Sequence, residues 1–158
     1  MDMNAPDHAG VRFPPPLIFL GFIVLGGALD HLFAIGPLPL PVWLQWVLTG
    51  VSGIAGLALI IGALSLFRRA GTPPEPWRPT KAIAEAGLYS RTRNPMYLGM
   101  AGIHLAVAIA FQSIGALVLL LPALITIDRA VVRREEAYLS RRFGESYAAY
   151  KRRVPRWF

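Results

Sequence analysis

Uncharged, apolar residues gather in three long runs, which short polar or proline-rich stretches separate. The first run, residues 17–35, is interrupted only by Asp30 and His31, and the second, residues 42–67, contains no charged residue. As a helix, each run is long enough to cross a hydrocarbon core of about 30 Å, at about 1.5 Å per residue. The alternating prolines of residues 36–41 cannot continue a helix, so we predict a short turn between two spans.

The third run, residues 94–127, also lacks Asp, Glu, Lys and Arg, but it is too long for a single span. Gln112 and Ser113 lie near its middle, and serine is a favourable N-cap for a new helix. We therefore predict a tight hairpin of two short helices, residues 95–111 and 113–132.

The C-terminal tail, residues 133–158, is too polar to span a membrane. Its residues 135–139 have a helical pattern, Phe143-Gly144 is expected to end that helix, and Glu145 or the next residue can begin another. The last residues, 154–158, have the composition of an interfacial anchor. The whole pattern predicts an all-α integral membrane protein of about four transmembrane helices with a short C-terminal cytoplasmic helical tail.

We expect residues 1–158 to form a single membrane domain. Residues 17–67 hold the two N-terminal spans, and residues 68–96 form a cytoplasmic loop that is rich in proline. Residues 97–132 hold the helical hairpin, and residues 133–158 hold the tail. A loop as long as 68–96 is usually either functional or disordered in a compact protein.

Composition and charge agree with a membrane protein. Hydrophobic residues make up 54% of the chain and charged residues 16%, and the mean hydropathy is +0.47. The net charge of +7 comes mostly from residues 68–96 and 128–158, which flank the apolar runs as cytoplasmic loops do. We therefore expect no nucleic-acid partner. We also expect a protein of a bacterial inner membrane, with both termini in the cytoplasm. The chain has no cysteine, which excludes thiolate chemistry and Cys-based metal sites, and we predict no metal site.

The most specific pattern is Gly-Leu-Tyr-Ser-Arg-Thr-Arg-Asn-Pro-Met-Tyr-Leu-Gly at residues 87–99. After the predicted hairpin it continues with Glu135-Glu136, Phe143-Gly144, Tyr147, Tyr150 and Val154-Pro155-Arg156. This ordered set resembles the isoprenylcysteine carboxyl methyltransferase and phospholipid methyltransferase superfamily of small membrane enzymes. The superfamily pattern runs Gly-x-Tyr, Arg-(His or Asn)-Pro-x-Tyr-x-Gly, a hydrophobic hairpin and a Glu-Glu pair, so the resemblance covers roughly residues 68–158.

The resemblance implies methyl transfer from S-adenosylmethionine to a lipophilic acceptor held in the membrane. A prenylcysteine-like carboxylate, a phospholipid headgroup and a small lipophilic nucleophile remain open as acceptors, although the prenylcysteine enzymes more often have histidine at the position of Asn94. It also implies a cofactor site on the cytoplasmic side, between the arginine–proline–tyrosine loop and the helix after the hairpin. The implied cofactor-binding residues are Tyr89, Arg93, Asn94, Pro95, Tyr97, Leu98, Gly99, Glu135 and Glu136.

The chemistry of these side chains fits the ligand. A guanidinium such as that of Arg93 suits the cofactor carboxylate, and the carboxylate of Glu135 or Glu136 suits its ammonium. Tyrosine faces, such as that of Tyr97, suit the adenine and the sulfonium cation. We also take Glu135 and Glu136 as candidate catalytic residues, with Arg153 as a further candidate that would hold a carboxylate substrate.

Simpler explanations compete with some of these assignments. Residues 93–97 alone fit an ordinary interfacial helix start, and a glutamate pair is usually a solvated helix face. For Asp30 and His31 we favour interfacial snorkelling or pairing with each other over a functional role. For His104 we favour a packed, hydrogen-bonded residue over a proton acceptor. Three arginines of the tail are most simply contacts with anionic lipid: Arg152, Arg153 and Arg156.

Two other classes of protein remain as alternatives. A membrane reductase of the sterol reductase type would bind a nicotinamide cofactor, but it needs more spans and a larger pocket than this chain readily supplies. A non-enzymatic membrane module, such as a small transporter half, would need polar residues at the middle of several spans, which are nearly bare here.

Overall fold

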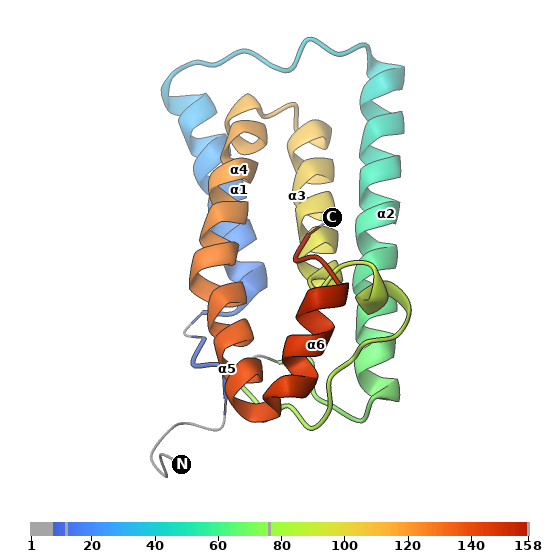
Figure 1. The fold of residues 1–158 in the computed structure, drawn as a ribbon. Coiled ribbons are helices and arrows are strands. Elements are labelled where there is room, and N and C mark those ends of the chain that lie inside the picture. Colours follow the sequence, from blue (N-terminus) through green and yellow to red (C-terminus); the bar gives the residue numbers. More distant parts are fainter. Residues whose placement is uncertain (1–7, 12, 76, 158) are drawn as a thin grey trace.

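The apolar runs of the sequence form long helices that stand side by side in the computed structural model, which describes residues 8–11, 13–75 and 77–157 (Figure 1). The bundle consists of α1 (Pro15–Leu32), α2 (Val42–Arg69), α3 (Pro95–Ala110) and α4 (Ile114–Ile127). A short 3-10 helix, η1 (Gly87–Ser90), precedes α3, and a π-helical turn, η2 (Asp128–Val132), continues α4 into α5 (Arg133–Phe143) and α6 (Glu145–Arg153). The described residues contain no strand.

The helices pack in two pairs, α1 with α4 and α2 with α3, and contacts between α3 and α4 join the pairs. By length and composition, α1, α2 and the continuous helix of residues 114–143 can each cross a membrane, while α3 is a shorter apolar helix. These features confirm the predicted fold class, an all-α integral membrane protein with about four transmembrane helices. The hairpin turn also lies where the sequence predicted it, between Ala110 and Ile114.

Glycines set how closely the paired helices approach. A Cβ added to Gly99 on α3 would lie 2.6 Å from the carbonyl oxygen of Gly56 on α2, and a Cβ on Gly56 would lie 2.6 Å from that of Gly99. In the other pair, a Cβ on Gly26 would overlap the backbone of Ala116, and one on Gly115 would overlap the backbone of Gly26. Small residues at such crossings are typical of membrane helices, because they let two backbones touch.

The structure differs from expectation at Asp30, which lies against the start of α4. Its carboxylate accepts hydrogen bonds from the Ser113 hydroxyl (2.5 Å) and from the Gly115 backbone amide (2.8 Å). Ser113 in turn accepts from the Ala116 amide at 3.0 Å, as an N-cap does. Asp30 therefore accepts hydrogen bonds at a helix start, where backbone donors have no partner within the helix, a role that we did not predict. The N-cap role of Ser113 is confirmed.

His104 is a packed residue, as the sequence analysis favoured. Its side chain is fully buried, and Nε2 donates to the carbonyl oxygen of Ala116 at 2.8 Å. The edge of its ring meets Phe19, with 6.0 Å between ring centroids. The imidazole thus joins α3 to α4 and α1, the helices that pack around it.

The tail is helical, and its first helix, α5, ends before Gly144 as predicted. Gly144 has a positive φ of 53°, a backbone conformation that favours glycine and does not continue a helix. Beyond α6 the chain returns to the start of α3 (Figure 1), where the Arg93 amide donates to the Pro155 carbonyl at 3.0 Å. Trp157 packs against the core of the bundle. The end of the tail is therefore built into the fold rather than standing apart as an anchor; Phe158 lies outside the described residues.

Candidate active site at the start of α3 and α5

A pocket opens at the end of the bundle where α3 begins and α4 passes into α5. The loop between α2 and α3, η1, the start of α3, and α5 and α6 together line it. Every tyrosine of the chain lines this one pocket, although the five are spread over some sixty residues of sequence. They are Tyr89, Tyr97, Tyr138, Tyr147 and Tyr150.

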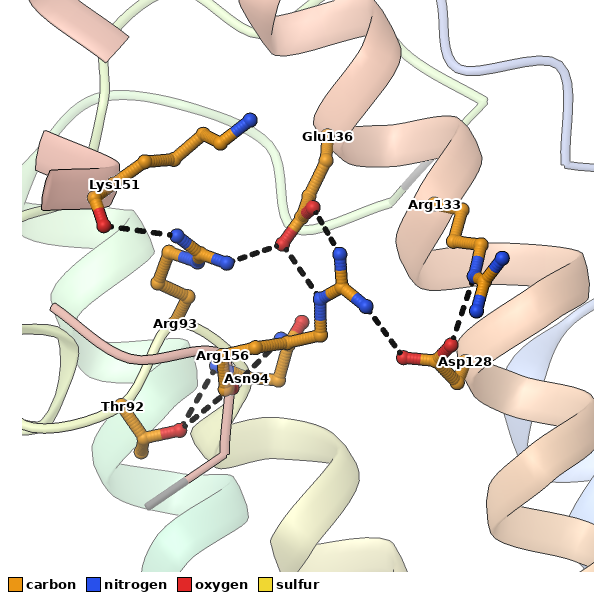
Figure 2. Close-up of polar contacts among 8 residues, drawn as sticks. All are labelled: Thr92, Arg93, Asn94, Asp128, Arg133, Glu136, Lys151 and Arg156. Carbon is orange, nitrogen blue, oxygen red and sulfur yellow. Dashed lines mark hydrogen bonds and ion pairs between the residues drawn. The ribbon is translucent and has the colours of Figure 1, made fainter. Parts of the chain in front are cut away.

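Glu136 is the centre of an ion-pair cluster beside this pocket (Figure 2). Its Oε1 accepts from Arg93 Nη2 at 2.8 Å and from Arg156 Nε at 3.0 Å, and its Oε2 accepts from Arg156 Nη2 at 2.7 Å. Arg156 also donates to Asp128 at 3.1 Å, and Asp128 accepts from Arg133 at 3.0 Å. Glu136 is only 8% exposed, so two guanidinium partners compensate a carboxylate that is largely removed from water.

One donor of Arg93 has no acceptor in the part of the chain that the structure describes. Its Nη1 donates to the Lys151 carbonyl at 3.3 Å and its Nη2 to Glu136, but its buried Nε has no hydrogen-bond partner among these residues. Buried polar atoms are nearly always paired, so an unpaired donor in a pocket wall indicates a place for an absent acceptor. A guanidinium suits a carboxylate in particular, as the sequence analysis expected of Arg93.

Glu135 has a different environment from its neighbour. Its Oε1 accepts a 2.6 Å hydrogen bond from the Tyr97 hydroxyl, and no ion pair to it is found within the described residues. A carboxylate that is partly withdrawn from water gains most from a cationic partner. Glu135 is therefore the member of the pair that can receive an ammonium group from a ligand.

Three tyrosines of the pocket that lie outside the membrane-spanning helices, Tyr89, Tyr147 and Tyr150, remain protonated. Burial raises the pKa of Tyr89 above its ordinary value, and the nearby negative charge of Glu135 raises that pKa further. Burial is also the main cause that raises the pKa of Tyr147 and of Tyr150. The Tyr150 hydroxyl donates to the Tyr89 carbonyl at 2.7 Å, which ties α6 to η1. The pocket thus presents neutral aromatic faces, which attract a cation.

The structure brings most of the predicted site residues together. Six of them line the pocket: Tyr89, Arg93, Asn94, Tyr97, Glu135 and Glu136. Asn94 precedes α3, yet its side chain donates to the Arg156 carbonyl at 3.0 Å instead of capping the helix.

Four other predicted residues are not part of the pocket lining. Pro95 is buried as the first residue of α3, and Gly99 contacts α2. Leu98 stands between Tyr97, which lines the pocket, and Gly99 in the sequence of α3. Arg153 is largely exposed and pairs with Glu85 at 2.6 Å. Among the described residues, Arg153 is not one that lines the pocket, although its positive charge acts on the pocket residue Tyr150.

Several residues of the site escaped the sequence analysis. Arg156 was assigned to lipid contacts, but it faces Glu136 and Asp128 inside the cluster (Figure 2). Tyr147 and Tyr150 belong to the motif that we recognised, and their regular spacing after Gly144 was a signal that they share the site. Other lining residues, such as Met96, Thr80 and Ile83, carry no such signal in the sequence.

The site and the fold can now be compared with known protein families. A family model described as phospholipid methyltransferase matches residues 51–146, which is more than half of the chain. The matched segment begins in α2, runs through the hairpin and ends at the start of α6, and it contains Arg93, Tyr97 and both glutamates. Searches among curated proteins and solved structures gave no significant match.

Proposed function

The chain belongs to the phospholipid methyltransferase family, and from that premise we propose that it transfers a methyl group from S-adenosylmethionine to a lipophilic acceptor held in the membrane. Family membership supports methyl transfer and a lipid-like acceptor. The methyl donor, the roles of the residues and a single catalytic domain over residues 1–158 are our proposal. The observation that carries it is the meeting of two distant motif segments in one pocket, where Arg93 contacts Glu136 and Tyr97 contacts Glu135.

The pocket has a complementary side chain for each charged group of S-adenosylmethionine. We assign the carboxylate of the ligand to Arg93, whose buried Nε lacks an acceptor among the described residues. We assign the ammonium to Glu135, which has no ion-pair partner among the described residues. The faces of Tyr89 and Tyr97 suit the adenine and the sulfonium, because an aromatic face attracts a cation.

Alignment is the main contribution that we propose for the protein. When bound, S-adenosylmethionine supplies a methyl group on a positively charged sulfur, which is already an activated leaving group. Arg93 and Glu135 would hold the two ends of its amino-acid portion, and the tyrosines would exclude water from the reacting centre. Fixing the reactants in line can supply roughly 7–11 kcal/mol of a barrier without any acid or base. Arg153 is not needed for this step.

We propose that the pocket faces the cytoplasm. The ends of α2 and the start of α5 carry Arg68, Arg69, Arg133 and Arg134, and an excess of basic residues is typical of cytoplasmic loops. The pocket lies where the apolar helices give way to these charged segments. An acceptor whose apolar tail stays in the inner leaflet would therefore present its headgroup to the pocket.

Two measurements test the proposal. Calorimetry on the detergent-purified protein should detect binding of S-adenosylhomocysteine, the demethylated product, and no binding of a reduced nicotinamide cofactor. Incubation with labelled S-adenosylmethionine and a total membrane lipid extract should then label one lipid class. Binding of the nicotinamide alone would contradict the proposal and favour the reductase alternative, and a failure to bind either compound would contradict both enzymes.

A further inference from the structure

We infer that Arg156 is a positioning residue, which holds Glu136 so that the Arg93 guanidinium stays directed toward the carboxylate of the bound ligand. The inference rests on the proposed function, because that function assigns the ligand carboxylate to Arg93. Arg156 does not line the pocket, so it acts through Glu136 and Arg93 rather than by touching the ligand.

The division of Glu136 between two arginines is the first observation. Arg156 donates to both carboxylate oxygens, at 3.0 and 2.7 Å, in the paired geometry that makes arginine–carboxylate contacts strong. Arg93 makes a single contact with Glu136, from Nη2 to Oε1 at 2.8 Å. Its buried Nε has no hydrogen-bond partner among the described residues, and we assign this donor to the ligand carboxylate.

The backbone around Arg156 is fixed to the same loop. The Arg156 carbonyl accepts from Thr92 Oγ1 at 3.1 Å and from Asn94 Nδ2 at 3.0 Å, and the Pro155 carbonyl accepts from the Arg93 amide at 3.0 Å. Trp157 packs on the bundle core beyond it. The C-terminal segment therefore holds both the backbone of Arg93 and the carboxylate that orients its side chain.

The charges in the cluster indicate what would follow if Arg156 were removed. Arg93 and Arg156 carry two positive charges against the two negative charges of Glu136 and Asp128, and Arg133 contacts Asp128 from a largely exposed position. Without Arg156, both oxygens of Glu136 would be open to Arg93. Arg93 would then turn its fork toward Glu136, and a ligand carboxylate would meet a guanidinium that is already neutralised.

The test compares two ligands that differ only in the carboxylate. We expect Arg156→Gln to weaken binding of S-adenosylhomocysteine about tenfold, since coupling through a shared ionic partner is typically worth ~0.5–3 kcal/mol. Binding of decarboxylated S-adenosylhomocysteine, which keeps the amine, should be unchanged. Calorimetry in detergent measures both. The matched control is Arg152→Gln, because Arg152 pairs with Glu145 at an exposed position and should affect neither ligand.

A second set of variants separates positioning from general damage. Arg156→Lys keeps the positive charge but cannot donate to both oxygens of Glu136 from a planar group. We therefore expect its affinity for S-adenosylhomocysteine to lie between those of Arg156→Gln and the wild type. In a Glu136→Gln background, the further change Arg156→Gln should have little effect, because its route to Arg93 is already broken.

Three results would overturn the inference. They are an unchanged affinity for S-adenosylhomocysteine in Arg156→Gln, an equal loss of affinity for the two ligands, and a full additional loss in the Glu136→Gln background. A wild-type protein that binds neither compound would instead refute the proposed function, and the inference would fall with it.

Discussion

At the scale of single residues, the two glutamates at the start of α5 show how neighbours in sequence can have different roles. Glu136 is saturated by Arg93 and Arg156, whereas Glu135 accepts one hydrogen bond from Tyr97 and no ion pair to it is found in the described chain. Their side chains leave the helix about 100° apart, so each faces a different set of partners. We therefore expect Glu135 to act in ligand binding and Glu136 in holding the site together.

Replacing Glu135 tests the first of these roles. Glu135→Gln keeps the shape of the side chain and an acceptor for Tyr97 but removes the charge. We expect binding of S-adenosylhomocysteine to weaken tenfold to a hundredfold, since loss of a charge-assisted contact typically costs ~1.5–3 kcal/mol. Calorimetry measures the affinity, and the thermal unfolding midpoint should stay close to that of the wild type. Unchanged affinity would show that Glu135 does not hold the ligand ammonium.

Replacing Glu136 should act mainly on stability. Glu136→Ala leaves the Arg93 and Arg156 guanidinium groups facing each other without their shared carboxylate. Breaking one partner out of a buried ion pair costs ~3–5 kcal/mol, and we expect the lower end because Arg156 remains partly in contact with solvent. Thermal unfolding in detergent measures the loss. Glu145→Ala is the control, because its exposed pair with Arg152 should contribute almost nothing.

The site residues could be predicted from the sequence only where a motif marked them. Arg93 and the glutamate pair stand in an ordered pattern, so their meeting was predictable before their contacts were known. Arg156 also belongs to that pattern and Arg153 does not, yet the sequence does not say which partners each of them contacts. That difference depends on the path of the chain after α6, which brings Arg156 to Glu136 and leaves Arg153 with Glu85.

At the scale of elements, the helix positions were easier to predict than the contacts between helices. An apolar run in a membrane protein must be helical to satisfy its backbone, so α2 begins at Val42 as expected and the prolines before it form the turn. The glycines of α2 indicated a close helix contact but not its partner. Gly99 was implied to bind a cofactor, yet it contacts Gly56, because the motif segment continues into α3.

A substitution at Gly99 tests the packing of α2 against α3. A Cβ at this position would lie 2.6 Å from a backbone oxygen of Gly56, so the two helices would have to separate in Gly99→Ala. We expect a loss of about 1–3 kcal/mol, which is typical of overpacking. Thermal unfolding in detergent measures it. The control is Gly50→Ala on α2, where an added Cβ meets nothing within 4 Å and stability should not fall; equal losses in both variants would contradict this packing role.

The contact between Asp30 and α4 gives a prediction that separates structure from function. Asp30→Ala removes the acceptor for the Ser113 hydroxyl and the Gly115 amide at the helix start. We expect a stability loss of about 1–2 kcal/mol, as for other helix caps, with unchanged affinity for S-adenosylhomocysteine. Unfolding and calorimetry measure the two quantities, with the neighbouring His31→Ala as control. A loss of affinity at full stability would show that this intramembrane carboxylate serves the reaction after all.

At the scale of the whole molecule, the two ends of the bundle differ in what they contain. At one end the Leu38 amide donates to the Gln112 carbonyl at 3.2 Å, so the turn after α1 and the turn after α3 lie together. At the other end lie the pocket, the ion-pair cluster and the basic tail. α3 and α4 form a hairpin and run in opposite directions. The segment after α4 therefore lies at the same end of the bundle as the start of α3.

The membrane orientation of these two ends is the last prediction. The chain contains no cysteine, so a cysteine introduced at an exposed position is the only thiol that a reagent can label in this protein. A maleimide that cannot cross the membrane should label Gly36→Cys, in the turn after α1, and Phe111→Cys, at the end of α3, from outside intact cells. Glu145→Cys, on α6, should react only after the cells are permeabilised.

Two labelling outcomes would contradict this topology in different ways. Protection of Phe111→Cys in intact cells, with Gly36→Cys labelled, would mean that the short helices α3 and α4 dip into the membrane without crossing it. Labelling of Glu145→Cys from outside, with both other sites protected, would place the pocket on the outer face, where the charge distribution argues against it. Intracellular S-adenosylmethionine could then not reach Arg93 and Glu135, so the proposed function requires the inward orientation as well as the geometry of the pocket.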